Sequence, residues 1–318
     1  MEPMNSIRPT KSKKYPWYDS VWLTRYTQAQ EIIRMVRPDM LKDFVDAFRI
    51  FHTRADFVTT LLEQPFDADT LRDIKRIAES LRPTELELNE SRTFGRFVVH
   101  DNPFFTELQQ RILPLVSDVA GEPVEGNYNF LSLYTPKGIC PVHLDAPEAK
   151  WTLDLCLDQT APWPIFFSQV QPWPGPESEQ EWSGEDWENK IKQCPSLNFK
   201  SHALKPGQAI LFSGSSQWHY REHMPKAPGQ PFCKLLFFHF IPKGGQRACP
   251  AEELGSAIWY PRTKPSALTK LTKAAAEADA PIAAQYCASP PSGQSEGDSR
   301  ANRRQVAIAR GSIQPPWE

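Results

Sequence analysis

The chain of 318 residues is 40% hydrophobic and carries a formal net charge of −2. That apolar content is enough for a folded core, and the charge balance argues against a nucleic-acid partner or an anionic membrane surface, which both select basic proteins. No apolar run reaches the roughly 18 residues of a membrane span, and the first residues lack the apolar centre of a secretory signal. These features predict a cytoplasmic globular protein.

A helical region is predicted over residues 25–125, behind an N-terminal arm of residues 1–24. Apolar residues recur at three- and four-residue spacing in "TQAQEIIRMVRP" and "DMLKDFVDAFRIF", and Asp39 is the expected N-cap of the second helix. "DADTLRDIKRIAESL" continues the pattern and ends before Pro83. A further helix from Pro103 to Val119 should be interrupted near Pro114.

After Gly121 the sequence pattern changes to short runs of β-forming residues separated by Pro and Gly. Runs spaced in this way predict a β-sandwich or barrel over residues 126–245, with the helices packed outside it. A C-terminal helical extension is expected over 246–284, and the Ser-, Gly- and Pro-rich end, 285–318, is expected to be disordered. The predicted strands are 128–134, 151–158, 163–170, 198–204, 208–214 and 233–241.

An insertion loop is predicted over residues 171–198. It holds three Trp residues and a run of acidic side chains with no basic one before Lys190. It is either a solvated loop or a Trp-bearing lid over a substrate.

A candidate metal site begins in "GICPVHLDAP". His143 and Asp145 are two residues apart, so an extended segment would direct both side chains to one face. A late His from another strand could join them, and His219 follows the run "QAILFSG", with His223 as a nearby competitor. Two imidazoles and one carboxylate on one face suit Fe(II), because three coordination positions stay open. The remaining histidines, His52, His100, His202 and His239, have no partner at ligand spacing. His202 and His239 lie in predicted strands and are expected to be packed or hydrogen-bonded there, whereas His52 is expected in a helix and His100 beside a loop.

Residues 126–242 resemble the iron(II)/2-oxoglutarate-dependent dioxygenases, in particular their prolyl-hydroxylase-like branch. "LYTPKGICPVHLD" is similar to that family's run from a co-substrate-lining Tyr to His-x-Asp, although Gly138 comes one place later than usual. "LKPGQAILFSGSSQWHYRE" is similar to the stretch that leads to the distal His, and "KLLFFHFIP" to the last core strand. The resemblance implies an α+β protein with a double-stranded β-helix, a jelly-roll or cupin-like barrel, buttressed by N-terminal helices. It also implies that His143, Asp145 and His219 bind Fe(II), with 2-oxoglutarate as co-substrate and O2 as oxidant.

The family also implies a cation that holds the far carboxylate of 2-oxoglutarate, commonly about ten residues after the distal His. This chain departs from that pattern, because position 229 is Gly. Arg221 and Lys234 are the alternatives, and Tyr134 is expected to line the co-substrate site, nine residues before His143.

The main functional hypothesis is an oxygenase that hydroxylates an unactivated C–H bond of a small molecule or amino-acid-like substrate, with release of succinate and CO2. A protein side chain is the alternative substrate. A cupin-like metalloenzyme without 2-oxoglutarate, and a barrel that has lost its metal and binds a partner through the Trp-rich loop, are alternatives from other classes. The sequence leaves the oligomeric state open.

Overall fold

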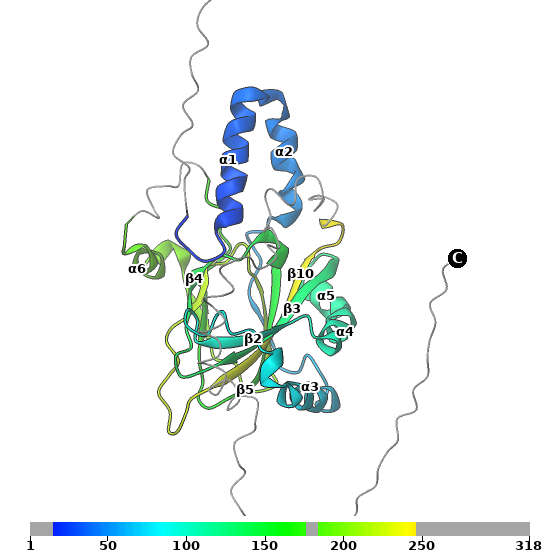
Figure 1. Ribbon diagram of the computed structural model, residues 1–318. Helices are drawn as coiled ribbons and strands as arrows, with labels where there is room; N and C mark the ends of the chain where they lie inside the picture. The colour runs from blue at the N-terminus through cyan, green and yellow to red at the C-terminus, as the bar shows by residue number, and fades with distance from the viewer. Residues whose placement is uncertain (1–14, 176–183, 246–318) are drawn as a thin grey trace, which may run out of the picture. The chain divides into compact units, whose positions relative to one another are not determined.

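The N-terminal part of the protein forms a helical hairpin. The computed structural model describes residues 15–175 and 184–245. α1 (Val21–Val36) and α2 (Leu41–Ala47) run side by side at one end of the β-strands (Figure 1). The predicted capping role of Asp39 is wrong: this residue lies in the 3-10 turn Pro38–Met40 between the helices, and Met40 is the N-cap of α2. Pro38 has no amide hydrogen with which to continue α1, so the chain turns here.

Three further helices follow the predicted periodicity. α3 (Ala68–Ser80) begins at Asp67, whose carboxylate accepts a hydrogen bond from the Thr70 amide. The expected interruption near Pro114 is confirmed, because α4 (Pro103–Arg111) and α5 (Leu113–Ala120) are separate helices that meet at Ile112. In Figure 1, α4 and α5 lie beside β3 and β10.

The β-structure consists of two antiparallel sheets. The larger has six strands in the order β1-β8-β5-β10-β3-β2, and the smaller has four in the order β4-β9-β6-β7. Most neighbouring strands in both sheets are not consecutive in the sequence, so the sheets bring remote residues together. The larger sheet comprises β1 (Thr60–Leu62), β2 (Arg96–His100), β3 (Val124–Tyr134), β5 (Trp151–Gln159), β8 (Ala209–Ser213) and β10 (Cys233–Pro242). The smaller comprises β4 (Cys140–His143), β6 (Ile165–Phe167), β7 (Lys200–His202) and β9 (His219–Arg221).

All six predicted runs contain strands, whereas β1, β2, β4 and β9 were not predicted as such. β1 and β2 come from the region expected to be only helical, yet they form the two edges of the larger sheet. Each is short, at three and five residues, and pairs only with a strand far along the chain.

Each sheet has an inner and an outer face, because side chains alternate along a strand. On the larger sheet, Leu131, Leu153 and Leu236 share one hydrophobic core with residues of α3, α4 and α5, and this is the outer face. The expected packing of helices outside the sheets is therefore confirmed. A different core joins Tyr134 and Phe212 of the larger sheet to Phe167 of the smaller one, so these residues mark the inner face. The inner faces carry the polar residues considered below.

The segment predicted as an insertion loop, 171–198, contains regular structure within its described residues. It contains the short helix α6 (Trp187–Lys192), and Trp173 is buried in a core with Trp22 and Tyr26 of α1. Trp173 therefore packs against α1 as a structural residue. Trp182 lies outside the described residues, as do the predicted C-terminal extension and tail.

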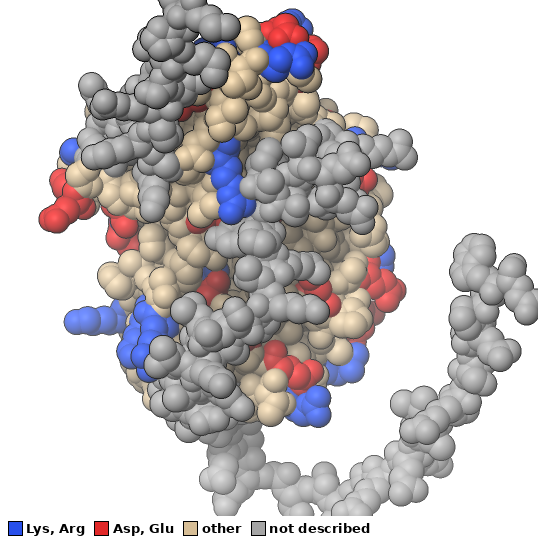
Figure 2. Space-filling model, turned by 45° about the horizontal axis from the view of Figure 1, so that its top comes forward, with Lys and Arg blue, Asp and Glu red and all other residues tan. Residues whose placement is uncertain are grey.

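The surface carries both signs of charge. On the face seen in Figure 2, Lys and Arg side chains alternate with Asp and Glu side chains and do not gather in one patch. Among the helices of the described ranges, none is both long and apolar enough to cross a membrane.

Candidate metal centre

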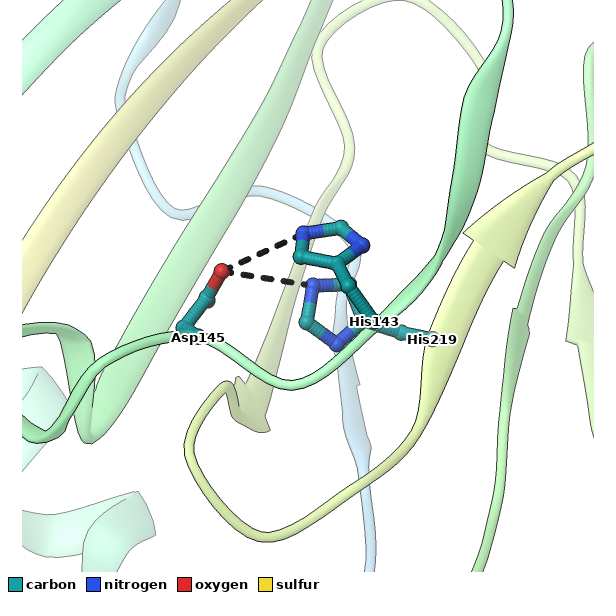
Figure 3. Close-up of side chains that lie close together, drawn as sticks. All are labelled: His143, Asp145 and His219. Carbon is teal, nitrogen blue, oxygen red and sulfur yellow. Dashed lines mark ion pairs between the residues drawn. The ribbon is translucent and has the colours of Figure 1, made fainter. Parts of the chain in front are cut away.

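The neighbouring residues His143 and Asp145 meet the distant His219 at one end of the smaller sheet. His143 ends β4 and His219 begins β9, and the two residues are register partners in this antiparallel pair. Asp145 follows β4 by two residues. One ligand atom from each of the three side chains can be chosen so that all lie within 4.8 Å of one another. Figure 3 shows both imidazoles turned toward the same Asp145 oxygen.

The donor atoms are held in position by their own backbone. Asp145 Oδ1 lies 3.3 Å from His143 Nε2 and 3.6 Å from His219 Nε2. The other ring nitrogen of each His, Nδ1, is hydrogen-bonded to the carbonyl two residues earlier, that of Pro141 at 2.8 Å and that of Gln217 at 2.9 Å. Such bonds fix the tautomer and direct Nε2 toward a metal. The set of two imidazole nitrogens and a carboxylate oxygen fits a ferrous ion with open positions.

The Asp145 carboxylate is placed by a close approach of two chain segments. The Asp145 amide donates to the Gly214 carbonyl at 2.9 Å, and Thr152 Oγ1 donates to Asp145 Oδ2 at 3.3 Å. A Cβ atom on Gly214 would lie only 2.1 Å from Asp145 Oδ2 and 2.6 Å from the Ala149 carbonyl oxygen. The absence of a side chain at position 214 thus leaves the room that the carboxylate occupies.

The electrostatics of His219 and Asp145 favour the protonation states that a metal requires. Burial lowers the pKa of His219 to about 4, and the neighbouring His143 adds to this shift. Burial alone would raise the pKa of Asp145, but the charge of His219 and the hydrogen bond with His143 hold it well below its usual range. A neutral imidazole and an ionised carboxylate are the forms that bind divalent metals. For His143 the shift is opposite: burial lowers its pKa, but the charge of Cys140 and the hydrogen bond with Asp145 outweigh burial and raise it well above the usual value.

Arg221 lies on the inner side of β9, two residues beyond His219. Its side chain is almost fully buried, and Nη2 donates to Asp154 Oδ2 at 2.6 Å. Nη1 donates to the Trp163 carbonyl oxygen, and the guanidinium lies 5.1 Å from the centre of the Trp163 ring. The buried Asp154 carboxylate therefore already balances the Arg221 charge.

Lys234 lies on the outer face of the larger sheet, whereas Arg221 faces the interior between the two sheets. It alternates with Cys233 and Leu235 of the inner core, and shares its face with Leu236 of the outer core. Its ammonium nitrogen lies 5.6 Å from the centre of the Phe232 ring, which packs against that outer core. Of the two cations weighed from the sequence, only Arg221 is on the side of the metal ligands.

Arg96 is an inner-face cation that the sequence analysis missed. It donates to the Tyr134 hydroxyl at 2.8 Å and to Glu90 Oε2 at 2.5 Å. Tyr134 in turn packs edge-on against Trp163, with ring centroids 4.8 Å apart, so Arg96 and Arg221 flank the same two rings. The alternation of Arg96, Val98 and His100 in "GRFVVH" is the signal that could have indicated it.

The other histidines lie outside the three-residue cluster. His223 is exposed and is not among the residues that could hold a metal in the described part of the chain. His202 lies 6.0 Å from Phe167, ring centre to ring centre, and His52 lies 4.2 Å from Trp173. His239 stacks on Tyr128 at 4.2 Å, and His100 is hydrogen-bonded to Glu87. The expectation that His202 and His239 are packed in their strands is confirmed. His52 was expected in a helix, but it lies directly after the 3-10 turn Arg49–Phe51.

Two residues of the predicted N-terminal arm also reach the metal centre. The Tyr18 ring lies 6.3 Å from the His143 ring, centre to centre, and remains 48% exposed. Asp19 accepts a hydrogen bond from the Ala146 amide at 2.9 Å, with its backbone in the left-handed region at φ 67°. Burial and the nearby Asp145 carboxylate raise the pKa of Asp19 to about 7. No sequence pattern indicated this contact.

Comparisons with known proteins gave structural matches only. No protein-family model matches the chain, and no curated protein does. HygX from Streptomyces hygroscopicus, solved with nickel and 2-oxoglutarate bound, is 14% identical with a TM-score of 0.43, over 58% of this chain and 82% of that chain.

Two further solved structures are similar at the same level. The α-ketoglutarate-dependent epimerase SnoN from nogalamycin biosynthesis is 15% identical with a TM-score of 0.44, over 72% of this chain and 90% of that one. A Pseudomonas putida prolyl-4-hydroxylase is 12% identical with a TM-score of 0.39, over 61% and 96%.

Proposed function

We propose that the protein is a non-haem Fe(II)- and 2-oxoglutarate-dependent oxygenase built on a double-stranded β-helix. The observation that carries the proposal is the cluster of His143, Asp145 and His219, in which strand pairing and backbone hydrogen bonds direct three donors toward one point. When bound, iron and 2-oxoglutarate would supply the activation of O2 and the oxidation of a substrate C–H bond, with release of succinate and CO2.

The protein's own part in this reaction is to bind and orient. His143, Asp145 and His219 would hold the metal. Arg221 would hold the far carboxylate of 2-oxoglutarate, because it lies on the same face of the same strand as His219 and a buried carboxylate requires a charge-assisted donor. Tyr134 lies beside it on the inner face and would line the co-substrate site.

Arg221 would have to serve two carboxylates. A guanidinium has five N–H donors, and the hydrogen bonds to Asp154 and to the Trp163 carbonyl leave others for a ligand. Arg96 adds a second guanidinium on the other side of Tyr134. Lys234 is disfavoured as the anchor because it faces the outer core.

The pairing of Arg221 with Asp154 also favours one alternative. If the ion pair occupies Arg221 fully, the inner face has no free anchor there, and a metal-dependent enzyme without 2-oxoglutarate, of the cupin kind, becomes the second candidate. The two candidates differ in whether Arg221 contributes to co-substrate binding.

The substrate is proposed to be a small molecule or an amino-acid-like compound, and hydroxylation is the simplest outcome. A protein side chain is the alternative substrate. The proposal is tested by incubating the protein with Fe(II), 2-oxoglutarate and O2 and measuring succinate. We expect slow succinate formation even without substrate, abolished by a chelator and in Asp145→Ala. Succinate formation that is equal in Asp145→Ala would contradict the proposal.

A further inference from the structure

Side chains from two separate segments lie beside the residues of the candidate metal centre. Asp19 is hydrogen-bonded to the amide of Ala146, the residue directly after Asp145, and Glu148 follows two residues later in the turn Pro147–Ala149. Tyr18 lies edge-on to the His143 ring. The N-terminal segment and the turn after Asp145 thus bring two carboxylates to the edge of the metal centre.

These two carboxylates differ from the other charged groups of the inner face in having no counter-ion. Neither Asp19 nor Glu148 has a Lys, Arg or His nitrogen within ion-pair distance in the described ranges, and both are only half-buried. The neighbouring charges, by contrast, are paired: Arg221 with Asp154 at 2.6 Å, Arg96 with Glu90 at 2.5 Å, Lys150 with Glu122 at 2.6 Å and His100 with Glu87 at 2.8 Å. Two carboxyl groups thus lie at the edge of the centre without a cationic partner in the described part of the chain.

Binding of the metal and of 2-oxoglutarate would bring no net positive charge to this edge of the centre. Fe(II), ionised Asp145 and a doubly charged 2-oxoglutarate sum to one negative charge, so the compensating cation must come from elsewhere. A carboxylate pair that is partly removed from water is stabilised by a cation within about 4 Å. A substrate with a cationic group is one partner that can supply this cation.

Two further features near the candidate metal centre fit a ligand that carries a nitrogen atom. His239 is buried on the inner face of β10 and stacks on Tyr128, yet its Nδ1 has no hydrogen-bond partner in the described part of the chain. A buried ring nitrogen of this kind is usually paired, by protein or by ligand. The exposed Tyr18 ring adds an aromatic face, to which ammonium groups are attracted.

We infer that the prime substrate of the proposed oxygenase presents a cationic nitrogen, an amine or ammonium group, to Asp19 and Glu148. The inference rests on the proposed function and names the chemical class of its substrate. Asp19 and Glu148 act as binding residues, and the protein prefers an amine to the neutral compound of the same shape.

The chain offers variants that remove charge with little change in shape. In Asp19→Asn the amide oxygen can still accept from the Ala146 amide, and Asn is among the residues that tolerate the left-handed backbone found at this position. Glu148→Gln is isosteric. Glu107→Gln on the exposed side of α4 is the matched control, because it makes the same chemical change away from the metal centre.

The experiment uses the full chain loaded with Mn(II) in place of iron, together with 2-oxoglutarate. Paramagnetic broadening of ligand proton signals then reports only molecules close to the metal and requires no turnover. The probes are amines and alcohols that share a skeleton: benzylamine with benzyl alcohol, butylamine with butanol, and cyclohexylmethylamine with cyclohexylmethanol. For at least one pair we expect the amine to bind about tenfold or more tightly, as for a charge-assisted hydrogen bond.

The Asp19→Asn/Glu148→Gln double variant should reduce that preference to about threefold or less, while Glu107→Gln leaves it unchanged. The inference alone is overturned if Mn(II) binds but no pair shows an amine preference, or if the preference survives in the double variant. If Mn(II) does not bind, or binds equally well to His219→Ala, the proposed function fails and the inference fails with it.

Discussion

Replacing Gly214 with alanine should weaken metal binding through Asp145. The added methyl group would stand 2.1 Å from Asp145 Oδ2, 2.6 Å from the Ala149 carbonyl oxygen and 2.9 Å from Thr152 Oγ1. The two nearest positions are far inside van der Waals contact, and one of them belongs to the backbone. The side chain free to move is that of Asp145, which would turn away from the histidines.

The expected size of the effect follows from the cost of overpacking. Inserting a methyl group into a packed site costs about 1–3 kcal/mol. Because about 1.4 kcal/mol corresponds to a tenfold change in affinity, Fe(II) binding should weaken by about 5- to 150-fold if the carboxylate takes up the strain. Thermal unfolding without metal, measured in parallel, shows how much of the strain is spread over the fold.

The assay is anaerobic calorimetric titration of Fe(II) into wild type and Gly214→Ala. Gly175→Ala is the matched control, because a Cβ atom there meets no atom of the described residues within 4 Å. An unchanged Fe(II) dissociation constant in Gly214→Ala would refute the reasoning that this glycine makes room for a ligand carboxylate.

Three further predictions concern the co-substrate anchor, a helix cap and pH. Arg221→Gln should weaken 2-oxoglutarate binding to the anaerobic Fe(II) protein about 10- to 100-fold. Lys234→Gln should change this binding less than about twofold, because the Lys234 charge faces the outer core. Equal effects of the two substitutions would contradict the assignment of Arg221 as the anchor. Asp67→Ala removes the N-cap of α3 and should lower the free energy of unfolding by about 1 kcal/mol, with metal affinity unchanged, as measured by urea denaturation. Burial opposes the charge of His100, but the hydrogen bond with Glu87 outweighs burial and raises the His100 pKa above 6.5. The contact between His100 and Glu87 therefore stabilises the fold fully below pH 6.5, and this stabilisation is lost as the pH rises through the raised pKa. His100→Gln should therefore destabilise by about 0.2–1 kcal/mol at pH 6 and by nothing measurable at pH 9, because the pair is half-exposed; a constant difference would contradict this.

The cluster of the three candidate metal ligands was predictable because each residue lies in a local pattern. His143 and Asp145 are two residues apart at the end of a strand, and His219 follows a run that forms β8. Helix α3 was predictable for the same reason, since the apolar spacing and the cap at Asp67 are local. Such features need no knowledge of what packs against them.

The residues that escaped prediction depend on long-range pairing. The inward direction of Arg96 is set by the register of β2 with β3, and Asp154 meets Arg221 only because both sheets present these side chains to one interior. The face to which Lys234 points depends on the register of β10 with its neighbours, which the sequence alone does not determine. The contact of Asp19 with Ala146 joins residues 127 positions apart in a segment without regular structure. Periodicity carries no signal for such contacts.

The proposed oxygenase is tested most directly by anaerobic titration of the protein with Fe(II) and 2-oxoglutarate, watching for the weak visible charge-transfer band of the chelated co-substrate. We expect the band in wild type and in His223→Ala, and its loss in His219→Ala, because His219 and not His223 belongs to the three-residue cluster. Iron that binds without producing the band would contradict the 2-oxoglutarate-dependent mechanism. A band that persists in His219→Ala but disappears in His223→Ala would contradict the metal site itself.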